Sequence, residues 1–258
     1  MADNDSVQKT LLVTLVLCVV CAVVVSAAAV LLRPQQAANQ ALNRKENILA
    51  AAGLLQPGIG VEQQFERVET RLVDLDSGRF TEVLDAQGYD QRKASRDPAL
   101  SAPVPQEQDI AKIQRRPKYA QVYLVRDGDG RLSRIVLPIK GYGLWSTLHG
   151  FIALEGDLNT VAGLGFYEHA ETPGLGGEVD NPSWKALWPG KRVYDADGKV
   201  VLRVIKGKAD PGRPEAVHQV DGLSGATLTS RGVDNLIHYW LGEQGFAPFL
   251  ANLRAGAA

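Results

Sequence analysis

The 258-residue sequence predicts an α+β protein with one membrane-spanning helix near its N-terminus. Residues 11–32 form an uncharged apolar run, and three pairs of strand-like segments lie between residues 119 and 205. Residues 233–241 carry an apolar stripe with helical spacing. Consecutive hairpins give an antiparallel sheet, and helices that do not alternate with the strands give the α+β class. We therefore expect a single transmembrane helix, then a soluble domain with a twisted antiparallel sheet and flanking helices.

The charge balance and the cysteines exclude several classes of protein. The chain has 28 Lys and Arg against 29 Asp and Glu, and residues 33–258 hold 27 of each sign. A neutral soluble part does not attract polyanions over a long range, so we expect no nucleic acid among the partners. Both cysteines, Cys18 and Cys21, lie in the apolar run, so no disulfide framework stabilises the soluble part. The zinc-binding spacings CxxC…CxxC and HExxH do not occur in the sequence.

The apolar run at residues 11–32 has the length of a membrane anchor. Its 22 residues span about 33 Å as a helix, close to the ~30 Å hydrocarbon core of a bilayer. A cleaved signal peptide is the alternative, but its apolar core has only ~7–15 residues. The N-terminal tail, residues 1–10, carries Asp3 and Asp5 against Lys9, which also favours a retained anchor. Cys18 and Cys21 share one helix face, where a plain helix contact is favoured over a metal or redox pair.

Residues 33–118 connect the anchor to the strand-rich part. Residues 33–56 are rich in helix formers and predict a helical stalk that Gln56-Pro57-Gly58 ends. Residues 57–118 form the N-terminal part of the soluble domain, with a helical segment at 61–70 and a short hairpin at 71–84. Residues 92–108 contain three prolines and no apolar periodicity, which predicts an exposed, solvated loop.

Residues 119–258 form the main part of the soluble domain. Three hairpins are predicted, and their paired segments are 119–125 with 132–139, 151–155 with 161–167, and 192–194 with 200–205. The apolar stripe then predicts an amphipathic helix, and its members are Val233, Leu236, Ile237, Trp240 and Leu241.

The segment before this helix, residues 221–230, combines small residues with hydroxyls and reads DGLSGATLTS. Its glycines and Ala226 let a ligand approach the backbone. The helix begins around residues 227–230, so free N–H groups there suit a phosphate. An ordinary Ser/Thr-rich helix cap explains the same residues, and the physical chemistry alone leaves both readings open.

Three motifs resemble those of the FMN-binding, covalently flavinylated subunits of electron-transport complexes. Residues 221–227, DGLSGAT, are similar to the flavinylation motif D-x-x-[ST]-G-A-[ST]. Residues 141–145, GYGLW, and residues 171–176, ETPGLG, are similar to the G-x-G-x-W and E-T-P-G-L-G segments of that family. With the anchor and the length, the chain resembles the C subunits of the Na⁺-translocating NADH:quinone reductases, although residues 57–118 contribute no motif.

The resemblance implies FMN joined to the Thr227 hydroxyl by a phosphoester, which a Mg²⁺-dependent flavin transferase forms from FAD. The other cofactor-binding residues in these motifs are Ser224, Gly225, Ala226, Asp221, Trp145, Tyr142, Glu171, Thr172, Leu175 and Gly176. Lys206 is a further candidate, because it could place a cation near the flavin's phosphate or ring, and an ordinary solvated lysine explains it equally well. Trp145, Tyr142 and Leu175 would contact the isoalloxazine ring, although the two aromatics also suit a core. Asp221 would brace the loop or be read by the transferase. His218 is expected to be an ordinary loop histidine.

The resemblance also implies a function and a location. The complex oxidises NADH, reduces ubiquinone and translocates Na⁺, and this chain relays electrons alongside other membrane and peripheral subunits. The chain itself has no Gly-rich dinucleotide fingerprint. The family places the flavin domain on the periplasmic side of the bacterial inner membrane. The positive-inside rule opposes this, because Arg33, Arg44 and Lys45 follow the anchor and only Lys9 precedes it. We adopt the family's orientation.

Three other functions fit parts of the sequence. The sister flavinylated subunit of an Rnf-type ferredoxin:NAD⁺ reductase shares the anchor and the motif, but this chain is longer. A hydrolase is disfavoured because residues 222–226, GLSGA, lack the final glycine of a G-x-S-x-G elbow. A cofactor-free, membrane-anchored binding domain remains the alternative from a different class.

Overall fold

The computed structural model describes residues 6–258, which divide into two compact units, one ending at Asn43 and the other starting at Arg44. Helix α1 (Val7–Ala51) contains the apolar run of residues 11–32, and the large apolar side chains of that run are exposed. The helix is long and apolar enough to cross a membrane. Of the predicted tail, residues 1–5 with Asp3 and Asp5 lie outside the described residues. Cys18 and Cys21 are free and exposed.

Helix α1 stops at Ala51, before the break expected at Gln56. Gly53 has φ +65°, so it adopts the left-handed conformation that ends many helices. Its N–H donates to the Ala50 carbonyl at 3.0 Å, and the Leu54 N–H donates to the Leu49 carbonyl at 2.8 Å. These two bonds satisfy carbonyls that the helix leaves open, so the glycine ends the helix earlier than the proline does.

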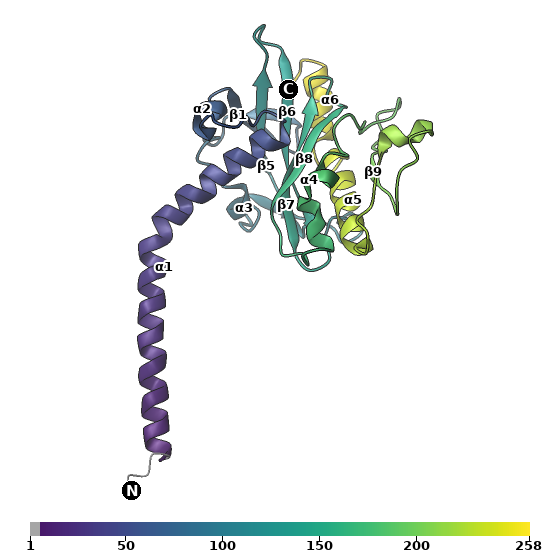
Figure 1. Cartoon of the computed structure of the whole chain (residues 1–258). Coiled ribbons are helices and arrows are strands. Elements are labelled where there is room, and N and C mark those ends of the chain that lie inside the picture. The colour runs from purple at the N-terminus through teal and green to yellow at the C-terminus, as the bar shows by residue number, and fades with distance from the viewer. Residues whose placement is uncertain (1–5) are drawn as a thin grey trace. The chain divides into compact units, whose positions relative to one another are not determined.

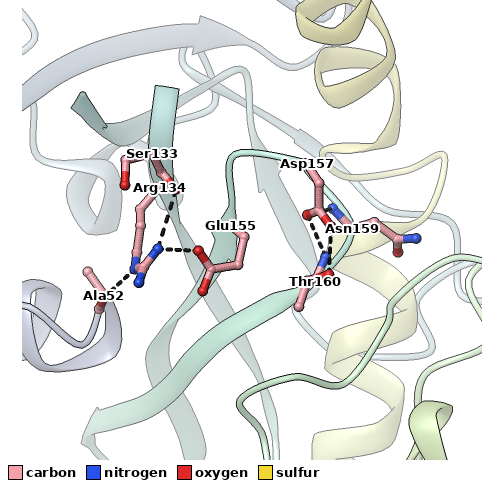
Figure 2. Close-up of polar contacts among 7 residues, drawn as sticks. All are labelled: Ala52, Ser133, Arg134, Glu155, Asp157, Asn159 and Thr160. Atoms are coloured by element: carbon pink, nitrogen blue, oxygen red, sulfur yellow. Dashed lines mark hydrogen bonds and ion pairs between the residues drawn. The ribbon is translucent and has the colours of Figure 1, made fainter. Parts of the chain in front are cut away.

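Arg134 fixes this helix end to the sheet, as Figure 2 shows. Its Nε donates to the Ala52 carbonyl at 2.9 Å, and its guanidinium pairs with Glu155 on the next strand. A cation at the C-terminal end of a helix also compensates the helix dipole.

Figure 2 also shows the turn of the neighbouring hairpin. Asp157 accepts hydrogen bonds from the N–H groups of Asn159 and Thr160 and from the Thr160 hydroxyl. Burial raises the pKa of Asp157, but these bonds outweigh burial and hold it below its usual value.

One antiparallel six-stranded sheet organises the soluble unit, with strand order β2-β1-β5-β6-β7-β8 (Figure 1). The strands are β1 (Val68–Asp74), β2 (Arg79–Thr81), β5 (Tyr119–Arg126), β6 (Leu132–Tyr142), β7 (Thr147–Glu155) and β8 (Val161–Glu168). The hairpins predicted at 71–84, 119–139 and 151–167 are confirmed. The α+β class with an antiparallel sheet is therefore confirmed.

The two faces of the sheet are covered differently, because alternate residues of a strand point to opposite faces. Ile135, Leu137 and Ile139 of β6 belong to the main core, together with α5 (Thr227–Leu241) and α6 (Ala247–Arg254). Figure 1 shows both helices on one side of the sheet. Val136 instead belongs to a smaller cluster with Ile48 and other residues from the end of α1. The helix predicted from the apolar stripe is confirmed as α5.

Three expectations need correction. The helix at 61–70 is only α2 (Val61–Phe65), because residues 68–70 pair with β5. The segment 92–108 is not a featureless exposed loop, since it includes most of α3 (Gln91–Ala94) and strand β3 (Ser101–Pro103). Strand β3 pairs with β4 (Arg115–Pro117), and the Ser101 side chain is buried.

The third predicted hairpin, 192–205, is reduced to one bridge between Tyr194 and Val200. The N–H groups of both Val201 and Leu202 donate to the Val193 carbonyl, so the chain folds back tightly and no ladder continues. Strand β9 (Arg203–Val204) then pairs in parallel with β10 (Gln219–Val220). The remaining elements are η1 (Gly176–Asp180), α4 (Pro182–Lys185) and η2 (Pro214–His218).

Candidate functional site

Three loops meet at the N-terminal end of α5, and they hold the three motifs. The Glu171 carboxylate joins them, because it accepts hydrogen bonds from the N–H groups of Leu144, Trp145 and Ser146 at 3.0–3.2 Å. It also accepts a 2.7 Å hydrogen bond from the Thr229 hydroxyl on α5. The Glu171 residue is only 5% exposed. The motifs therefore meet around one buried carboxylate.

This carboxylate is ionised at neutral pH. Burial by itself raises the pKa of Glu171, but the hydrogen bonds from the Thr229 hydroxyl and the three backbone N–H groups outweigh burial. The pKa therefore lies below its usual value. A buried charge that accepts this many donors is satisfied by the protein itself.

Glycines let the loops approach the carboxylate closely. A Cβ atom at Gly143 would lie 2.7 Å from a Glu171 oxygen, and one at Gly176 would lie 2.5 Å from the Thr229 hydroxyl. At Gly232 of α5, a Cβ would lie 2.4 Å from the Tyr142 carbonyl. Only glycine allows these approaches, so the glycines of the first two motifs keep the site compact.

The four hydroxyls of residues 221–230 divide into two pairs. Thr229 is buried against Glu171, and the buried Ser230 Oγ accepts a hydrogen bond from the Leu223 N–H at 2.9 Å. Ser224 and Thr227 are exposed, and the hydrogen bonds of the described chain do not use their hydroxyls. Thr227 is the first residue of α5, whereas Ser224 lies in the turn before it.

The N-terminus of α5 leaves backbone donors open beside Thr227. Its N-cap residue, Ala226, has no side-chain acceptor. The first helical hydrogen bond runs from the Ser230 N–H to the Ala226 carbonyl at 3.0 Å. Within residues 6–258 the N–H groups of residues 227–229 donate to no acceptor. A phosphate on the Thr227 hydroxyl would meet these donors and the positive end of the helix dipole.

Large apolar side chains from the same loops are exposed to solvent, and Trp145 is the most exposed of them, at 66%. The members of this apolar platform are Tyr142, Leu144, Trp145, Leu175 and Leu228. Gly225, with φ +71°, brings the motif against Leu175: its Cβ would lie 3.1 Å from a Leu175 methyl. Apolar and aromatic surfaces of this kind suit a planar ring system such as a flavin.

Asp221 and Lys206 are two further residues predicted to bind the cofactor. The Asp221 carboxylate accepts a hydrogen bond from the Ala209 N–H at 2.8 Å, so Asp221 braces the loop. Lys206 is exposed, and its neighbour Ile205 contacts Gly222, where a Cβ would lie 2.3 Å from the Ile205 carbonyl. His218 Nδ1 lies 2.7 Å from the Arg192 carbonyl, as expected of a loop histidine.

Glu171 and Gly176 have a different place from the one expected. Both are buried and face the inside of the loops, so they hold the site together without an exposed surface for a ligand. Thr172 and Leu175 are exposed in the same motif. Residues 172–175 are therefore the part of this motif that solvent, and so a ligand, can reach.

Sequence reasoning missed Leu144, Leu228, Thr229 and His169 as parts of the site. His169 Nδ1 accepts a hydrogen bond from the Glu171 N–H at 3.2 Å, and its Nε2 lies 2.7 Å from Asp180. The only sequence signal for Thr229 was its spacing. Two residues after Thr227 on a helix, it must point to nearly the opposite side.

Comparison with known proteins gives a consistent family. Residues 143–242 match the family model of the FMN-binding domain. The chain is 58% identical over 262 residues to the C subunit of the Na(+)-translocating NADH-quinone reductase of Pseudomonas aeruginosa, with 100% of each chain covered. It is 49% identical over 259 residues to the protein of the same name from Yersinia pestis, covering 99% of this chain and 96% of the relative.

Solved structures agree with these sequences. The crystal structure of Shewanella oneidensis NqrC superposes with a TM-score of 0.76 at 38% identity, covering 82% of this chain and 96% of that one. The C subunit of the Na(+)-translocating NADH-quinone reductase from Parabacteroides distasonis superposes with a TM-score of 0.63 at 27% identity, covering 85% and 96%.

Proposed function

Because the chain belongs to the family of C subunits of the Na⁺-translocating NADH:quinone reductases, we propose that it relays electrons through FMN esterified to the Thr227 hydroxyl. The chain is a subunit of an ion-translocating oxidoreductase and contains an FMN-binding domain. We propose the covalent bond to FMN, the residues that surround it and the electron relay through it.

One observation carries the site assignment. Of the four hydroxyls in residues 221–230, Thr227 combines exposure, freedom from other hydrogen bonds and a position at the open N-terminus of a helix. The backbone donors of residues 227–229 would compensate the charge of a phosphodiester, and the exposed Lys206 lies on the neighbouring segment. A flavin transferase that uses FAD as donor would reach this hydroxyl from solvent.

The rest of the proposed site holds the ring. Trp145, Leu175 and Leu228 would cover the isoalloxazine faces and exclude water, while Thr172 would bond its polar edge. Bound FMN supplies the redox chemistry, since it takes up and releases electrons one or two at a time. The protein fixes its position, because the loops that present these side chains are joined through Glu171.

The full chain co-expressed with its flavin transferase tests the proposal. The tryptic peptide of residues 209–231 is expected to gain the mass of FMN less one water, and Thr227→Ala should abolish both this mass and the in-gel fluorescence. Ser224→Thr, which keeps a residue that the motif accepts at this position, should retain both. Flavin retained after Thr227→Ala, or an unmodified wild-type peptide from a colourless protein, would refute the covalent site.

We further propose that α1 is a single-pass anchor in the bacterial inner membrane, that the soluble unit is periplasmic, and that membrane and peripheral subunits of the complex are its partners. The length and composition of α1, and the relatives that are subunits of the Na⁺-translocating NADH-quinone reductase, support anchoring in a membrane complex. Proteolysis of spheroplasts tests the orientation: external protease should degrade the soluble unit, and its protection would place this unit in the cytoplasm.

A further inference from the structure

A cavity of about 490 Å³ is lined by Lys140 of β6 and His149 of β7, which pair in register, and also by Trp240 of α5. Its lining contains six cationic side chains and no carboxylate: Arg44, Arg92, Arg96, Lys112, Arg115 and Lys140. Apart from Tyr142 at its edge, the lining contains no residue proposed above to bind FMN.

Most of this positive charge is not neutralised by the protein. Arg92 forms a bidentate pair with Glu168, at 2.5 and 2.7 Å. Within residues 6–258 the other five cations of the lining have no carboxylate oxygen within 4.0 Å. The soluble part as a whole is neutral, so this concentration of unpaired charge is local.

Several of these cations are fixed by neutral acceptors only. Arg44 donates to Gln121 and Tyr123, and its buried Nε has no partner. The Arg115 guanidinium donates to the hydroxyl and carbonyl of Ser101 at 2.9 and 2.8 Å. Lys140 Nζ has one long contact, 3.5 Å to the Arg115 carbonyl. Neutral oxygens hold the donors in place without cancelling their charge.

The rim of the cavity is built with strained backbone. Lys112 and Gln114 have φ of +53° and +60°, which non-glycine residues rarely adopt. Asp109 stabilises this loop, because its two carboxylate oxygens accept the N–H groups of Ile113 and Gln114 at 2.8 and 2.7 Å. The loop holds Lys112 at the opening beside Tyr142, with its Nζ 5.9 Å from the ring centre.

Titration behaviour agrees with an electropositive site. Burial, against the opposing effect of Asp109 and with the help of Arg92 and Arg96, lowers the pKa of Lys140 to about 8. Burial and the Arg92 charge lower the pKa of His149 to about 4, so its neutral ring offers a hydrogen-bond donor at pH 7. An anion in the cavity would stabilise the Lys140 ammonium.

We propose that this cavity binds a phosphate-bearing anion, with Arg44, Arg96, Lys112, Arg115 and Lys140 as its donors. Guanidinium groups bind phosphate oxygens with bidentate geometry, and the cavity leaves room for an organic group beyond the phosphate. The phosphate belongs either to a soluble molecule or to a lipid headgroup. The site is separate from Thr227 and does not depend on the proposed function.

Calorimetric titration of the full chain in uncharged detergent with inorganic pyrophosphate tests the soluble source. We expect saturable binding of one anion per chain at low ionic strength, unchanged in Thr227→Ala. The double variant Arg96→Gln/Lys112→Gln should raise Kd at least tenfold. The matched control Arg79→Gln/Lys199→Gln removes two exposed charges outside the cavity and should leave Kd within twofold.

A second measurement covers the lipid source. In nanodiscs, acetylation of Lys112 and Lys140 is compared between phosphatidylcholine alone and phosphatidylcholine with phosphatidic acid. Protection of both lysines only with phosphatidic acid, together with loss of the protection of Lys140 in the cavity double variant, supports a headgroup. The proposal is overturned if neither pyrophosphate binding nor protection occurs, or if the cavity and control variants lose them equally.

Discussion

The site around Thr227 and the cationic cavity lie on either side of Tyr142, yet they treat charge in opposite ways. Around Thr227 the buried charge, Glu171, accepts donors from two segments, and the exposed surface is apolar. In the cavity, five cations have no carboxylate partner among residues 6–258, and three of them, Arg44, Arg115 and Lys140, donate to neutral oxygens. Comparing them shows that a chain with almost no net charge can still concentrate uncompensated charge in one place.

The two regions also differ in how far the protein's own groups satisfy their polar side chains. Near Thr227 the polar groups satisfy one another except for the exposed Ser224 and Thr227 hydroxyls and the backbone donors of residues 227–229, so the scaffold forms without a ligand. In the cavity, Arg44, Arg115 and Lys140 donate to neutral oxygens, so their charge would be compensated only by a bound anion. Removing a polar side chain near Thr227 should therefore lower the stability of the folded protein. Removing a cation from the cavity should raise it.

The largest effect on stability is expected from Glu171→Ala. This change leaves three backbone N–H groups and the Thr229 hydroxyl without their acceptor, so the free energy of unfolding should fall by about 3 kcal/mol. Thermal unfolding of the full chain in detergent measures this, with Glu178→Ala on the neighbouring η1 as the control. A loss below about 1 kcal/mol would show that the carboxylate does not organise the loops.

Acid should weaken the cavity side of the sheet through His149, which burial and Arg92 keep neutral while Glu168 opposes them. The unfolded chain takes up this proton near pH 6.5 and the folded chain only near pH 4, so stability falls as pH drops through this window. We expect about 2 kcal/mol of this loss to disappear in His149→Phe. Denaturant unfolding at pH 7 and pH 4.5 measures it, and equal losses in both proteins would contradict the assignment.

Lys140→Met should stabilise the protein, because it removes a partly buried cation. At pH 7 the folded chain must keep this ammonium charged despite burial and the neighbouring Arg92 and Arg96. The variant should gain about 1 kcal/mol in stability and bind pyrophosphate more weakly. The gain should shrink towards pH 10, where the folded wild type holds Lys140 neutral. A destabilised variant at pH 7 would contradict this view of the cavity.

The smallest effect is expected at the apolar platform. Leu228→Ala removes an exposed side chain, so stability should change by no more than about 0.5 kcal/mol. The bound flavin should nevertheless become more accessible, and iodide should quench its fluorescence more strongly. An exposed leucine of α1, Leu42, provides the control. Equal quenching in both variants would remove Leu228 from the proposed site.

The sequence predicted those parts of the fold that local signals encode. The turn sequence at residues 127–130 and the apolar stripe at 233–241 give β5–β6 and α5 directly. The prolines at 92–108 misled, because a two-stranded ladder of three residue pairs tolerates proline at its ends. The motifs predicted which loops form the candidate site, since each is a continuous segment.

The contacts that join these loops were not predictable from one sequence. Thr229 and Glu171 are 58 residues apart, and no local pattern indicates that they meet. The cavity is a stronger case, because its cations come from α1, α3, β4, β6 and two connecting loops, and each resembles an ordinary solvated residue in isolation. The net charge of the whole chain, which is close to zero, gave no indication of this local cluster of cations.

The pairing of Thr229 with Glu171 has a consequence for the spacing of the flavinylation motif. An α-helix turns by about 100° per residue, so Thr227 and Thr229 point about 200° apart. Anchoring the second threonine inward sets the angular phase of α5 and turns the first outward. Inserting one residue after Thr227 would rotate this phase and aim the hydroxyl away from the ring platform. The spacing of the two threonines along α5 therefore sets the direction in which the proposed attachment point, the Thr227 hydroxyl, faces.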